Sequence, residues 1–346
     1  MPASLQLPDA EQLVICRDRA SGLVAAIAVD DTTLGPALGG IRMKAYPSEA
    51  EAIAECGRLA RVMTLKNALA DTGFGGGKAV IVESAAIVDR GAALRAFGRF
   101  VARTGVYAPA ADLGTSSDDV RIVASAAPGM VVDDVDTAQA TAVGVHAAIA
   151  SAVRAAGVAR SLDGITVAVQ GVGHVGARLA RLLVADGARV VVADADERRA
   201  QAVAASVAGD VVAPDAIVTT ACDVLAPCAL ARVIDERTVE CVQARVVAGA
   251  ANDVLARPEL AERLAERGVH YVPDFLANAG GVIQVRAHRD EWSEERLAAA
   301  LREIGARTAA VLAEARAGAE LPLTIAIRAA QARLARPPRP VEEISA

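Results

Sequence analysis

Lysine is rare in this chain, and one of its lysines directly follows a run of glycines. Only Lys44, Lys66 and Lys78 are lysines among the 36 lysine and arginine residues, and the stretch GFGGGK ends at Lys78. Arginine stays protonated throughout the accessible pH range, whereas a desolvated lysine can lose its proton and act as a base or nucleophile. Lys78 is therefore a candidate for proton transfer, with chance placement as the alternative. Lys44 stands near Arg42 and Tyr46 and is expected on an ordinary strand-to-turn surface.

The glycine run does not fit the phosphate-binding loop of nucleotide-hydrolysing proteins. That loop requires a glycine, four residues, Gly-Lys, and then Ser or Thr. Thr72 stands at the first of these positions and Ala79 follows Lys78, so a magnesium ion would have no hydroxyl ligand. The glycine run before Lys78 is therefore not a phosphate-binding loop of this type.

A second glycine-rich stretch, GVGHVG at residues 171–176, has the spacing of a dinucleotide-binding turn. It follows a predicted strand over residues 167–170 and opens a predicted helix. Gly171 permits the turn, Gly173 lets the backbone approach a pyrophosphate at the positive end of the helix, and Gly176 lets helix and strand pack closely. The alternative is a Rossmann-like domain that binds no nucleotide.

The next predicted strand, residues 189–193, ends at Asp194, which stands 23 residues after Gly171. A carboxylate at this position accepts hydrogen bonds from the ribose hydroxyls and repels a 2′-phosphate, so NAD is favoured over NADP. Arg198 and Arg199 follow and weaken that exclusion. His174 lies inside the turn and is expected at the surface rather than in acid–base chemistry. A dinucleotide site together with a glycine-embedded lysine suggests hydride transfer beside a lysine base.

The elements that must position these residues follow from apolar patterning. A hairpin turn over residues 18–22 joins two strands in the first third, and Ser48 is expected to cap a helix, with Glu51 as its capping-box partner. In the first third the expected elements are strands 13–16 and 23–29, helix 48–62, loop 73–77, strand 78–82, helix 89–101 and strand 106–108, which leads to Asp112.

The middle of the chain is predicted to be a doubly wound α/β domain. Its centre is a strand–turn–helix–strand unit over residues 161–196. The other expected elements are helix 140–156, strands 222–225, 245–248 and 269–272, and a largely helical segment 293–336. The predicted divisions of the chain are residues 1–135, 136–320 and 321–346.

Composition excludes several classes of function. The net charge of −6, with no basic run before the Arg-Pro tail, argues against nucleic-acid binding. The apolar stretches are of strand length, which argues against membrane insertion, and the N-terminus lacks a signal-peptide pattern. The odd number of cysteines shows no metal spacing and predicts reduced, mostly buried thiols in a cytoplasmic protein. No zinc site and no Ser-His-Asp arrangement is expected from the scattered histidines. The cysteines are Cys16, Cys56, Cys222, Cys228 and Cys241, and the histidines are His146, His174, His270 and His288.

Long stretches of the chain resemble the amino-acid dehydrogenase family of leucine, valine, phenylalanine and glutamate dehydrogenases, with the leucine and valine types most similar. The stretches are LGPALGGIRMKAYPSEAEAIAECGRLARVMTLKNALADTGFGGGKAVIV, DLGTSSDD, CDVLAPCAL, VVAGAANDVL and YVPDFLANAGGVIQV. The resemblance covers nearly the whole chain. It implies an α/β fold with an N-terminal substrate and oligomerisation domain (1–135), a Rossmann NAD-binding domain (136–320), and a C-terminal return helix and tail (321–346). The implied reaction is reversible NAD-dependent oxidative deamination of an L-amino acid to a 2-oxo acid and ammonia.

The resemblance also implies roles for individual residues. Lys78 would be the catalytic lysine, held near neutral by burial and by the charge of Lys66, and would activate water to attack the imine. Lys66 would bind the substrate carboxylate, and Asp112 would exchange protons with the amine. Gly39, in a GG turn, would lend backbone contacts to the substrate. Helix capping is the alternative role for Asp112.

The remaining implied contacts lie in the second half of the chain. Asn252 and Asn278 would contact cofactor and substrate in the cleft, and Thr141 would contact the nicotinamide carboxamide. Turn formation is the alternative for both asparagines, and helix N-capping is the alternative for Thr141. The residues assigned to the cofactor are Gly171, Val172, Gly173, His174, Val175, Gly176, Asp194, Thr141, Cys228, Ala229, Ala250 and Asn252.

The substrate side chain is expected among aliphatic residues, which by motif position are Leu38, Ala110, Val282 and Val285. None of these offers a charge for a glutamate carboxylate, so branched-chain aliphatic substrates are favoured. Single methylene groups contribute only ~1–3 kcal/mol, so valine and leucine are not separated. An aromatic amino-acid dehydrogenase and a non-catalytic NAD-binding descendant are the alternatives. A 2-hydroxy-acid dehydrogenase would need a His–carboxylate pair that this sequence does not offer.

The chain departs from the family between Asp112 and Thr141. Only 29 residues separate them, and PGMVVDDVDTAQAT stands where the family usually carries a glycine-rich segment. The resemblance further implies a homo-oligomer assembled through the first domain, a small-molecule substrate, and no metal.

Overall fold

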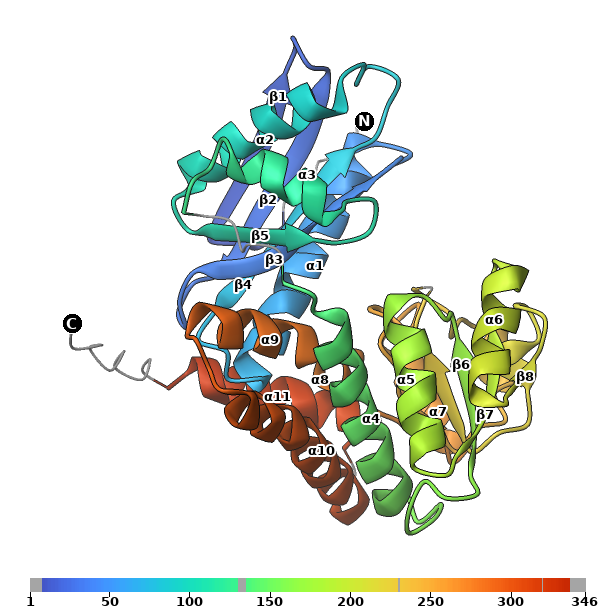
Figure 1. Ribbon diagram of the computed structural model, residues 1–346. Helices are drawn as coiled ribbons and strands as arrows, with labels where there is room; N and C mark the ends of the chain where they lie inside the picture. The colour runs from blue at the N-terminus through green and yellow to red at the C-terminus, as the bar shows by residue number, and fades with distance from the viewer. Residues whose placement is uncertain (1–7, 130–134, 230, 319, 337–346) are drawn as a thin grey trace, which may run out of the picture. The chain divides into compact units, whose positions relative to one another are not determined.

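The computed structural model describes residues 8–129, 135–229, 231–318 and 320–336 (Figure 1). Its contacts divide the chain into two compact units. The first unit is Met1–Val135 with Ala330–Ala346, and the second is Asp136–Ala329. The functional roles given above to the predicted domains stay predictions.

The first unit is built on a five-stranded sheet in the order β1-β2-β4-β3-β5. β1 pairs antiparallel with β2, which confirms the predicted hairpin, and β2 pairs antiparallel with β4. β3 lies parallel to both β4 and β5. The strands are β1 (Gln12–Asp18), β2 (Leu23–Asp31), β3 (Ala37–Lys44), β4 (Gly75–Val82) and β5 (Tyr107–Ala111).

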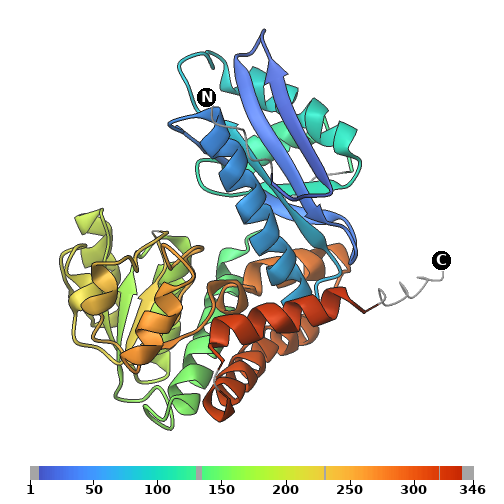
Figure 2. The same cartoon turned by 180° about the vertical axis from the view of Figure 1, so that it is seen from behind.

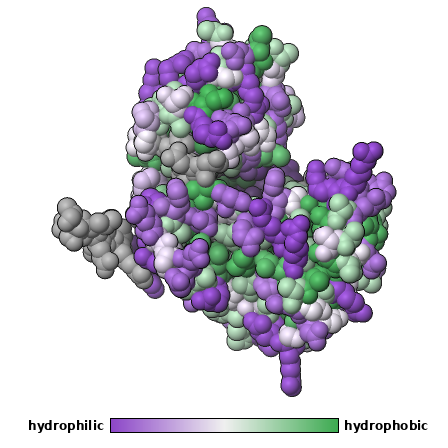
Figure 3. Space-filling view, viewed as in Figure 1, coloured by the Kyte–Doolittle hydropathy of each residue, from purple (hydrophilic) through white to green (hydrophobic). Residues whose placement is uncertain are grey.

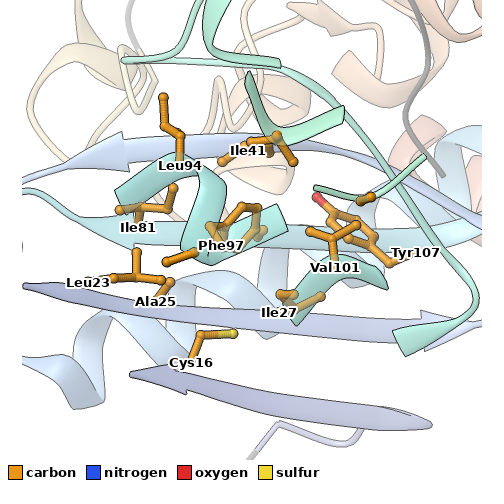
Figure 4. Packing of buried hydrophobic residues seen from close by; sticks show 14 of the residues in the cluster. Cys16, Leu23, Ala25, Ile27, Ile41, Ile81, Leu94, Phe97, Val101 and Tyr107 are labelled. Atoms are coloured by element: carbon orange, nitrogen blue, oxygen red, sulfur yellow. The ribbon is translucent and has the colours of Figure 1, made fainter. Parts of the chain in front are cut away.

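Helices cover both faces of this sheet (Figures 1 and 2). On one face, Phe97 and Val101 of α2 (Arg90–Thr104) pack with Ile27 and Ile81 of the strands (Figure 4). α3 (Ser117–Ala124) packs beside α2. On the other face lies α1 (Glu49–Leu69), which packs Ala52, Cys56 and Ala60 against Ala28 and Val80. Successive strand residues point to opposite faces, so even-numbered residues of β4 face α1.

The start of α1 is set by its cap. The Ser48 side chain accepts a hydrogen bond from the Glu51 backbone N–H, as predicted, while its hydroxyl donates to the Glu51 carboxylate at 3.3 Å. α1 continues to Leu69, beyond the predicted end at residue 62, so Lys66 lies within the helix.

Two glycine segments lie in strands, so the expected GG turn at Gly39 is wrong, and the expected loop over residues 73–77 is wrong at 75–77 and holds only at 73–74. Gly39 lies inside β3, and residues 75–77 begin β4. A Cβ on Gly39 would lie 1.7 Å from the carbonyl oxygen of Gly77, and one on Gly76 would lie 2.0 Å from Thr64 Oγ1 of α1. Glycine at these positions lets β3 approach β4 closely and lets β4 approach α1 closely, and it does not reverse the chain.

The second unit contains a six-stranded sheet in the order β11-β10-β9-β6-β7-β8, with all described pairs parallel. Numbered from β6, this order is 3-2-1-4-5-6, the arrangement of dinucleotide-binding Rossmann folds. The predicted doubly wound fold is confirmed. The strands are β6 (Thr166–Gln170), β7 (Arg189–Ala193), β8 (Asp210–Val211), β9 (Val224–Pro227), β10 (Val246–Val247) and β11 (His270–Tyr271).

Helices make up most of the rest of this unit, and α4 packs along α5 and α10. The chain passes from the second unit to the first within α11. The helices are α4 (Ala138–Ala155), α5 (His174–Ala185), α6 (Glu197–Val207), η1 (Ile217–Thr219), η2 (Thr238–Glu240), α7 (Leu260–Glu266), α8 (Asp274–Ala277), α9 (Gly280–Arg289), α10 (Glu294–Ala317) and α11 (Pro322–Leu334).

Hydrophilic residues cover much of the face that Figure 3 shows, with hydrophobic residues in smaller groups. Within the described part of the chain, no helix is long and apolar enough to cross a membrane. The cysteines are free thiols: Cys16 and Cys56 are buried, Cys222 and Cys228 are half-buried, and Cys241 is exposed. Burial raises the pKa of Cys16 and Cys56 to about 12.

We expect Gly39→Ala to destabilise the first unit by about 3 kcal/mol, because the new methyl group must push β3 away from β4. Urea unfolding followed by circular dichroism measures this. The matched control is Gly91→Ala in α2, where a Cβ meets only side-chain tips at 3.3 Å. This control should leave stability unchanged or raise it by up to about 1 kcal/mol. Equal stability of the two variants would contradict the close-approach explanation.

Candidate active site

Three parallel strands place Lys78 and Asp112 side by side. In the register, Leu38 pairs with Gly76 and Ile41 with Ala79, so Gly40 lies alongside Lys78. Asp112 directly follows β5, which pairs with β3 on its other edge. Lys78 Nζ lies 2.8 Å from Asp112 Oδ2. A Cβ on Gly40 would lie 2.6 Å from Asp112 Cβ and 3.1 Å from Lys78 Nζ, so glycine at this position makes room for the pair.

Asp112 belongs to a line of alternating charges, which we call the charged network: Lys78, Asp112, Arg42, Glu55 and Lys44. Asp112 Oδ2 also accepts a hydrogen bond from Arg42 Nε at 3.0 Å. Arg42 Nη1 donates to Glu55 Oε1 of α1 at 2.8 Å, and Lys44 Nζ donates to Glu55 Oε2 at 2.9 Å. Lys78 and Arg42 are only 5% and 8% exposed.

The network corrects the expectation that Lys44 and Arg42 lie on an ordinary strand surface. Arg42 is buried between two carboxylates, and Lys44 is half-buried against Glu55. Sequence reasoning therefore missed Arg42 and Glu55. A signal was present, because strand alternation places residues 40, 42 and 44 on one face of β3.

The two carboxylates of the network are held in their charged forms. Burial opposes ionisation of Asp112, but Lys78 and Arg42 outweigh it and hold the pKa of its carboxyl well below the usual range. Burial likewise opposes ionisation of Glu55, and Lys44 with Arg42 lowers its pKa. Burial and Lys66 were expected to keep Lys78 near neutral. The Asp112 carboxylate, which lies directly beside the Lys78 ammonium group, was not part of that expectation. At 2.8 Å the two side chains are close enough to exchange a proton directly.

Lys66 is 7% exposed near the end of α1. Lysine is almost never buried in proteins without a partner or a function. The next residue, Asn67, fixes this end of the helix to the glycine strand, because its Nδ2 donates to the carbonyl oxygen of Gly75 at 2.6 Å. The hydroxyl of Tyr107 in β5 donates a hydrogen bond to the carbonyl oxygen of Gly39 in β3 at 2.9 Å. The backbone around Lys66 and Gly39 is thus held by buried hydrogen bonds.

Two of the alternative capping roles are excluded by the observed caps. Ser116 caps α3, with a capping box formed by Asp119, so Asp112 is not a helix cap. Thr141 lies inside α4 rather than at its start, and its hydroxyl donates to the carbonyl oxygen of Thr137 at 2.8 Å.

The glycine turn of the second unit lies between β6 and α5, beside β9, where the strand order reverses. Gly171 has φ +86°, and a Cβ there would lie 2.3 Å from Ala229 Cβ. A Cβ on Gly176 would lie 1.9 Å from the Gly171 carbonyl oxygen and 3.3 Å from Cys228 Cβ. A Cβ on Gly173 would meet nothing within 4 Å. Gly171 and Gly176 are thus fixed by packing, whereas Gly173 leaves open space at the α5 N-terminus, which fits close approach of a pyrophosphate.

Asp194 is bound to this turn. Its carboxylate accepts hydrogen bonds from the backbone N–H groups of Val172 and Asp196, both at 2.9 Å. Arg199 Nη1 lies 3.3 Å from Asp194 Oδ1. Burial opposes ionisation, yet the two backbone N–H groups and Arg199 lower the pKa of Asp194. Position and charge therefore fit a ribose-binding carboxylate, and Arg199 lies directly against it.

A third group of predicted residues surrounds Asn278. This residue is buried, and its Nδ2 donates to Asn252 Oδ1 at 2.9 Å and to the Ala250 carbonyl at 3.2 Å. Among the described residues, Asn278 Oδ1 and Gln170 Oε1 are buried acceptors that make no hydrogen bond. Such groups are costly inside a protein and are expected where a ligand supplies the missing donor.

The remaining predicted residues are distributed over the two units. Leu38 is buried in β3 and Ala110 half-buried in β5, whereas Val282 and Val285 are buried in α9 of the second unit. His174 is exposed at the start of α5. Part of the altered segment, residues 130–134, lies outside the described residues. No group of three His, Cys, Asp or Glu side chains in the described ranges could hold a metal ion.

A Rossmann sheet with a glycine turn and a carboxylate at the end of its second strand is typical of dehydrogenases that use a dinucleotide. Residues 11–128 match the dimerisation domain of Glu/Leu/Phe/Val dehydrogenases, and residues 135–198 and 192–337 match Glutamate/Leucine/Phenylalanine/Valine dehydrogenase. The chain belongs to this family of amino-acid dehydrogenases, which uses a nicotinamide cofactor.

Individual relatives cover most of the chain. Leucine dehydrogenase of Bacillus subtilis (strain 168) is 38% identical over 296 residues, 83% of this chain and 81% of that protein. Valine dehydrogenase of Streptomyces coelicolor is 40% identical over 347 residues, 95% of this chain and 94% of that protein. The crystal structure of L-tryptophan dehydrogenase from Nostoc punctiforme superposes with a TM-score of 0.80 and 35% identity, covering 94% of this chain and 96% of that one. The predicted family is confirmed.

Asp112→Asn tests the charge pairing. Because the pKa of Asp112 is lower in the folded chain than in the unfolded one, its carboxylate stabilises the fold above about pH 4, and this contribution is lost as the pH falls through the folded-state pKa. At neutral pH we expect the variant to unfold with a free energy about 3 kcal/mol lower, since Lys78 and Arg42 lose a buried partner. The difference should shrink below about pH 4.

Urea unfolding at a series of pH values measures this difference. The matched control is Glu236→Gln, which removes an exposed ion pair with Arg257 and should cost less than about 1 kcal/mol. A stability difference between wild type and Asp112→Asn that does not change with pH would contradict the ionisation assigned to Asp112.

Proposed function

We propose that this protein catalyses the reversible NAD-dependent oxidative deamination of a branched-chain aliphatic L-amino acid to a 2-oxo acid and ammonia. The observation that carries the proposal is the buried pair of Lys78 and Asp112, 2.8 Å apart on the face of the sheet that α1 covers. Burying a lysine and an aspartate together is costly, and perturbed buried pairs of this kind cluster at catalytic sites.

The side chains divide the reaction between them. Lys66 binds the substrate carboxylate through its ammonium group, and Asp112 takes a proton from the substrate amine. Bound NAD supplies the acceptor for the hydride that leaves the amino-acid Cα. Lys78, in its neutral form, then takes a proton from the water that attacks the resulting imine carbon. Asp112 returns its proton to the amine, which leaves as ammonia, and the hydroxyl of the carbinolamine passes its proton to the Asp112 carboxylate as the 2-oxo acid forms. Lysine suits this step because it can give up its proton, whereas arginine stays charged.

The residues of the second unit support NAD rather than NADP. Asp194 is anionic and is held by the amide of Val172, so a 2′-phosphate on the ribose would meet a fixed negative charge. Arg199 lies against the same carboxylate and partly offsets that charge. We therefore propose NAD as the preferred cofactor, with weak use of NADP.

The proposed substrate class rests on the aliphatic residues Leu38, Ala110, Val282 and Val285, and on relatives that are leucine and valine dehydrogenases. An aromatic L-amino acid is the second candidate. It is favoured by one observation, the 35% identity to an L-tryptophan dehydrogenase over nearly the whole chain. The match of residues 11–128 to a dimerisation domain supports a homo-oligomer formed through the first unit.

The first test is NADH formation by the purified protein with a panel of L-amino acids. We expect turnover with valine, leucine or isoleucine. Lys78→Arg keeps the charge, but arginine cannot become neutral at accessible pH, so kcat should fall by about 10³-fold or more. Lys44→Arg is the matched control, because arginine can also form the ion pair with Glu55, and its kcat should stay within about threefold of wild type.

Each other result would correct a specific part of the proposal. Turnover of aromatic amino acids without aliphatic ones would replace the branched-chain assignment by the second candidate. Equal activity of Lys78→Arg and wild type would remove Lys78 from the chemistry. NAD binding without turnover of any amino acid would favour a non-catalytic descendant.

The cofactor assignment predicts the effect of Asp194→Ser. Removing the carboxylate leaves Arg199 available to a 2′-phosphate, so the ratio of kcat/KM for NADP to that for NAD should rise by about 100-fold. Steady-state kinetics with both cofactors gives the ratio. The double variant Asp194→Ser/Arg199→Ala should lose most of the gain in NADP use. An unchanged ratio in the single variant would refute the role of Asp194.

A further inference from the structure

We propose that Arg42, anchored by Glu55, is the positioning residue that holds Asp112 in its working orientation. The inference rests on the proposed function of Asp112 and extends it to two residues to which the sequence analysis gave no role in the site. Arg42 lies on β3 and Glu55 on α1, so the device ties the helix that carries Lys66 to the strand beside Lys78.

The geometry of Arg42 suits this role. Its guanidinium presents Nε to Asp112 Oδ2 at 3.0 Å and Nη1 to Glu55 Oε1 at 2.8 Å, so two carboxylates bind the same rigid planar group. A guanidinium holds its donors in a fixed fork, whereas a lysine ammonium is a point charge on a flexible stem. Arg42 therefore fixes the direction of the Asp112 carboxylate as well as its charge.

The backbone of Asp112 is also fixed, through Thr115. Its N–H donates to Thr115 Oγ1 at 2.9 Å, and the Thr115 hydroxyl donates to the Ile41 carbonyl at 2.7 Å. Ile41 is the residue before Arg42, so backbone and side chain of Asp112 are both held by one short segment of β3. With Gly40 leaving space above that segment, the carboxylate has room to lie between Lys78 and Arg42.

Charged side chains reach Asp112 from two neighbouring strands. Lys78 comes from β4 and Arg42 from β3. Beyond Arg42, Glu55 and Lys44 continue the alternation. Without Arg42, Asp112 would keep Lys78 as its ionic partner, and Glu55 would keep Lys44.

Stability alone does not explain a buried arginine at this position. Apolar residues of similar size often replace buried ion pairs with no loss of stability. An orientation requirement does explain it, because a misplacement of about 1 Å in a catalytic group costs roughly 100-fold in rate.

A double-variant cycle tests the proposal. In Arg42→Met we expect kcat for deamination to fall by about 100-fold while KM for the amino acid stays within about threefold. In the Asp112→Asn background, adding Arg42→Met should change kcat by less than about twofold, because Arg42 acts through Asp112. The control Arg17→Met removes another strand-to-α1 ion pair, with Glu49, and should leave kcat unchanged.

Two further variants separate positioning from folding. Arg42→Lys should recover part of the lost kcat, because its ammonium reaches one carboxylate at a time. Glu55→Gln leaves the Arg42–Asp112 bond in place but weakens its anchor, so kcat should fall by about tenfold. Urea unfolding of every variant identifies any that do not fold.

The outcomes distinguish this inference from the proposed function. The positioning role is refuted if wild type deaminates amino acids but Arg42→Met retains full kcat. It is also refuted if the kcat reductions caused by Arg42→Met and Asp112→Asn simply multiply in the double variant. If wild type deaminates nothing, the proposed function fails instead. Urea unfolding of the same single and double variants then decides whether Arg42 and Asp112 are energetically coupled. We expect a coupling of at least about tenfold in the unfolding equilibrium constant. Additive effects of the two substitutions on the free energy of unfolding would contradict the coupling.

Discussion

A lysine buried in the middle of a sheet needs a carboxylate beside it, and much of the first unit follows from that requirement. Lys78 and Asp112 come from β4 and from the end of β5, with β3 between them. The middle strand carries Gly40 at the crossing point because any side chain there would collide with the pair. Arg42 and Glu55 then extend the charge pairing to α1. The charged side chains of Lys78, Asp112, Arg42 and Glu55 and the glycine between the first two therefore satisfy steric and electrostatic requirements together.

Glycine solves a comparable problem in the second unit. Gly171 and Gly176 let the turn, α5 and the segment after β9 approach one another, while Gly173 leaves space at the helix N-terminus. Arginine and lysine serve different purposes in this chain. Arg42 and Arg199 hold carboxylates in place, whereas lysine is kept at positions 66 and 78, where the proposed chemistry needs an ammonium group that binds or exchanges a proton.

Local patterns were sufficient for much of the fold. The hairpin of β1 and β2, the Ser48 cap and the β6–α5–β7 unit were predictable because each depends on neighbouring residues. Residues 39 and 75–77 were not, because glycine favours turns locally and only the packed sheet shows the close approach it serves. The pairing of Arg42 with Asp112 spans 70 positions in sequence, so no local pattern contained it. Lys78 was identified by the rarity of lysine and the glycine run before it, whereas Lys66 and Asp112 were identified only by resemblance to a family.

We propose that Lys78 and Asp112 act directly at the amine-bearing carbon of an amino acid. The decisive measurement is a crystal structure of the protein with NAD and an unreactive branched-chain amino-acid analogue. We expect the analogue's carboxylate on Lys66 and its amine within hydrogen-bonding distance, about 3 Å, of Asp112, with Lys78 beside the α-carbon. An analogue bound with its amine away from both side chains would refute these roles.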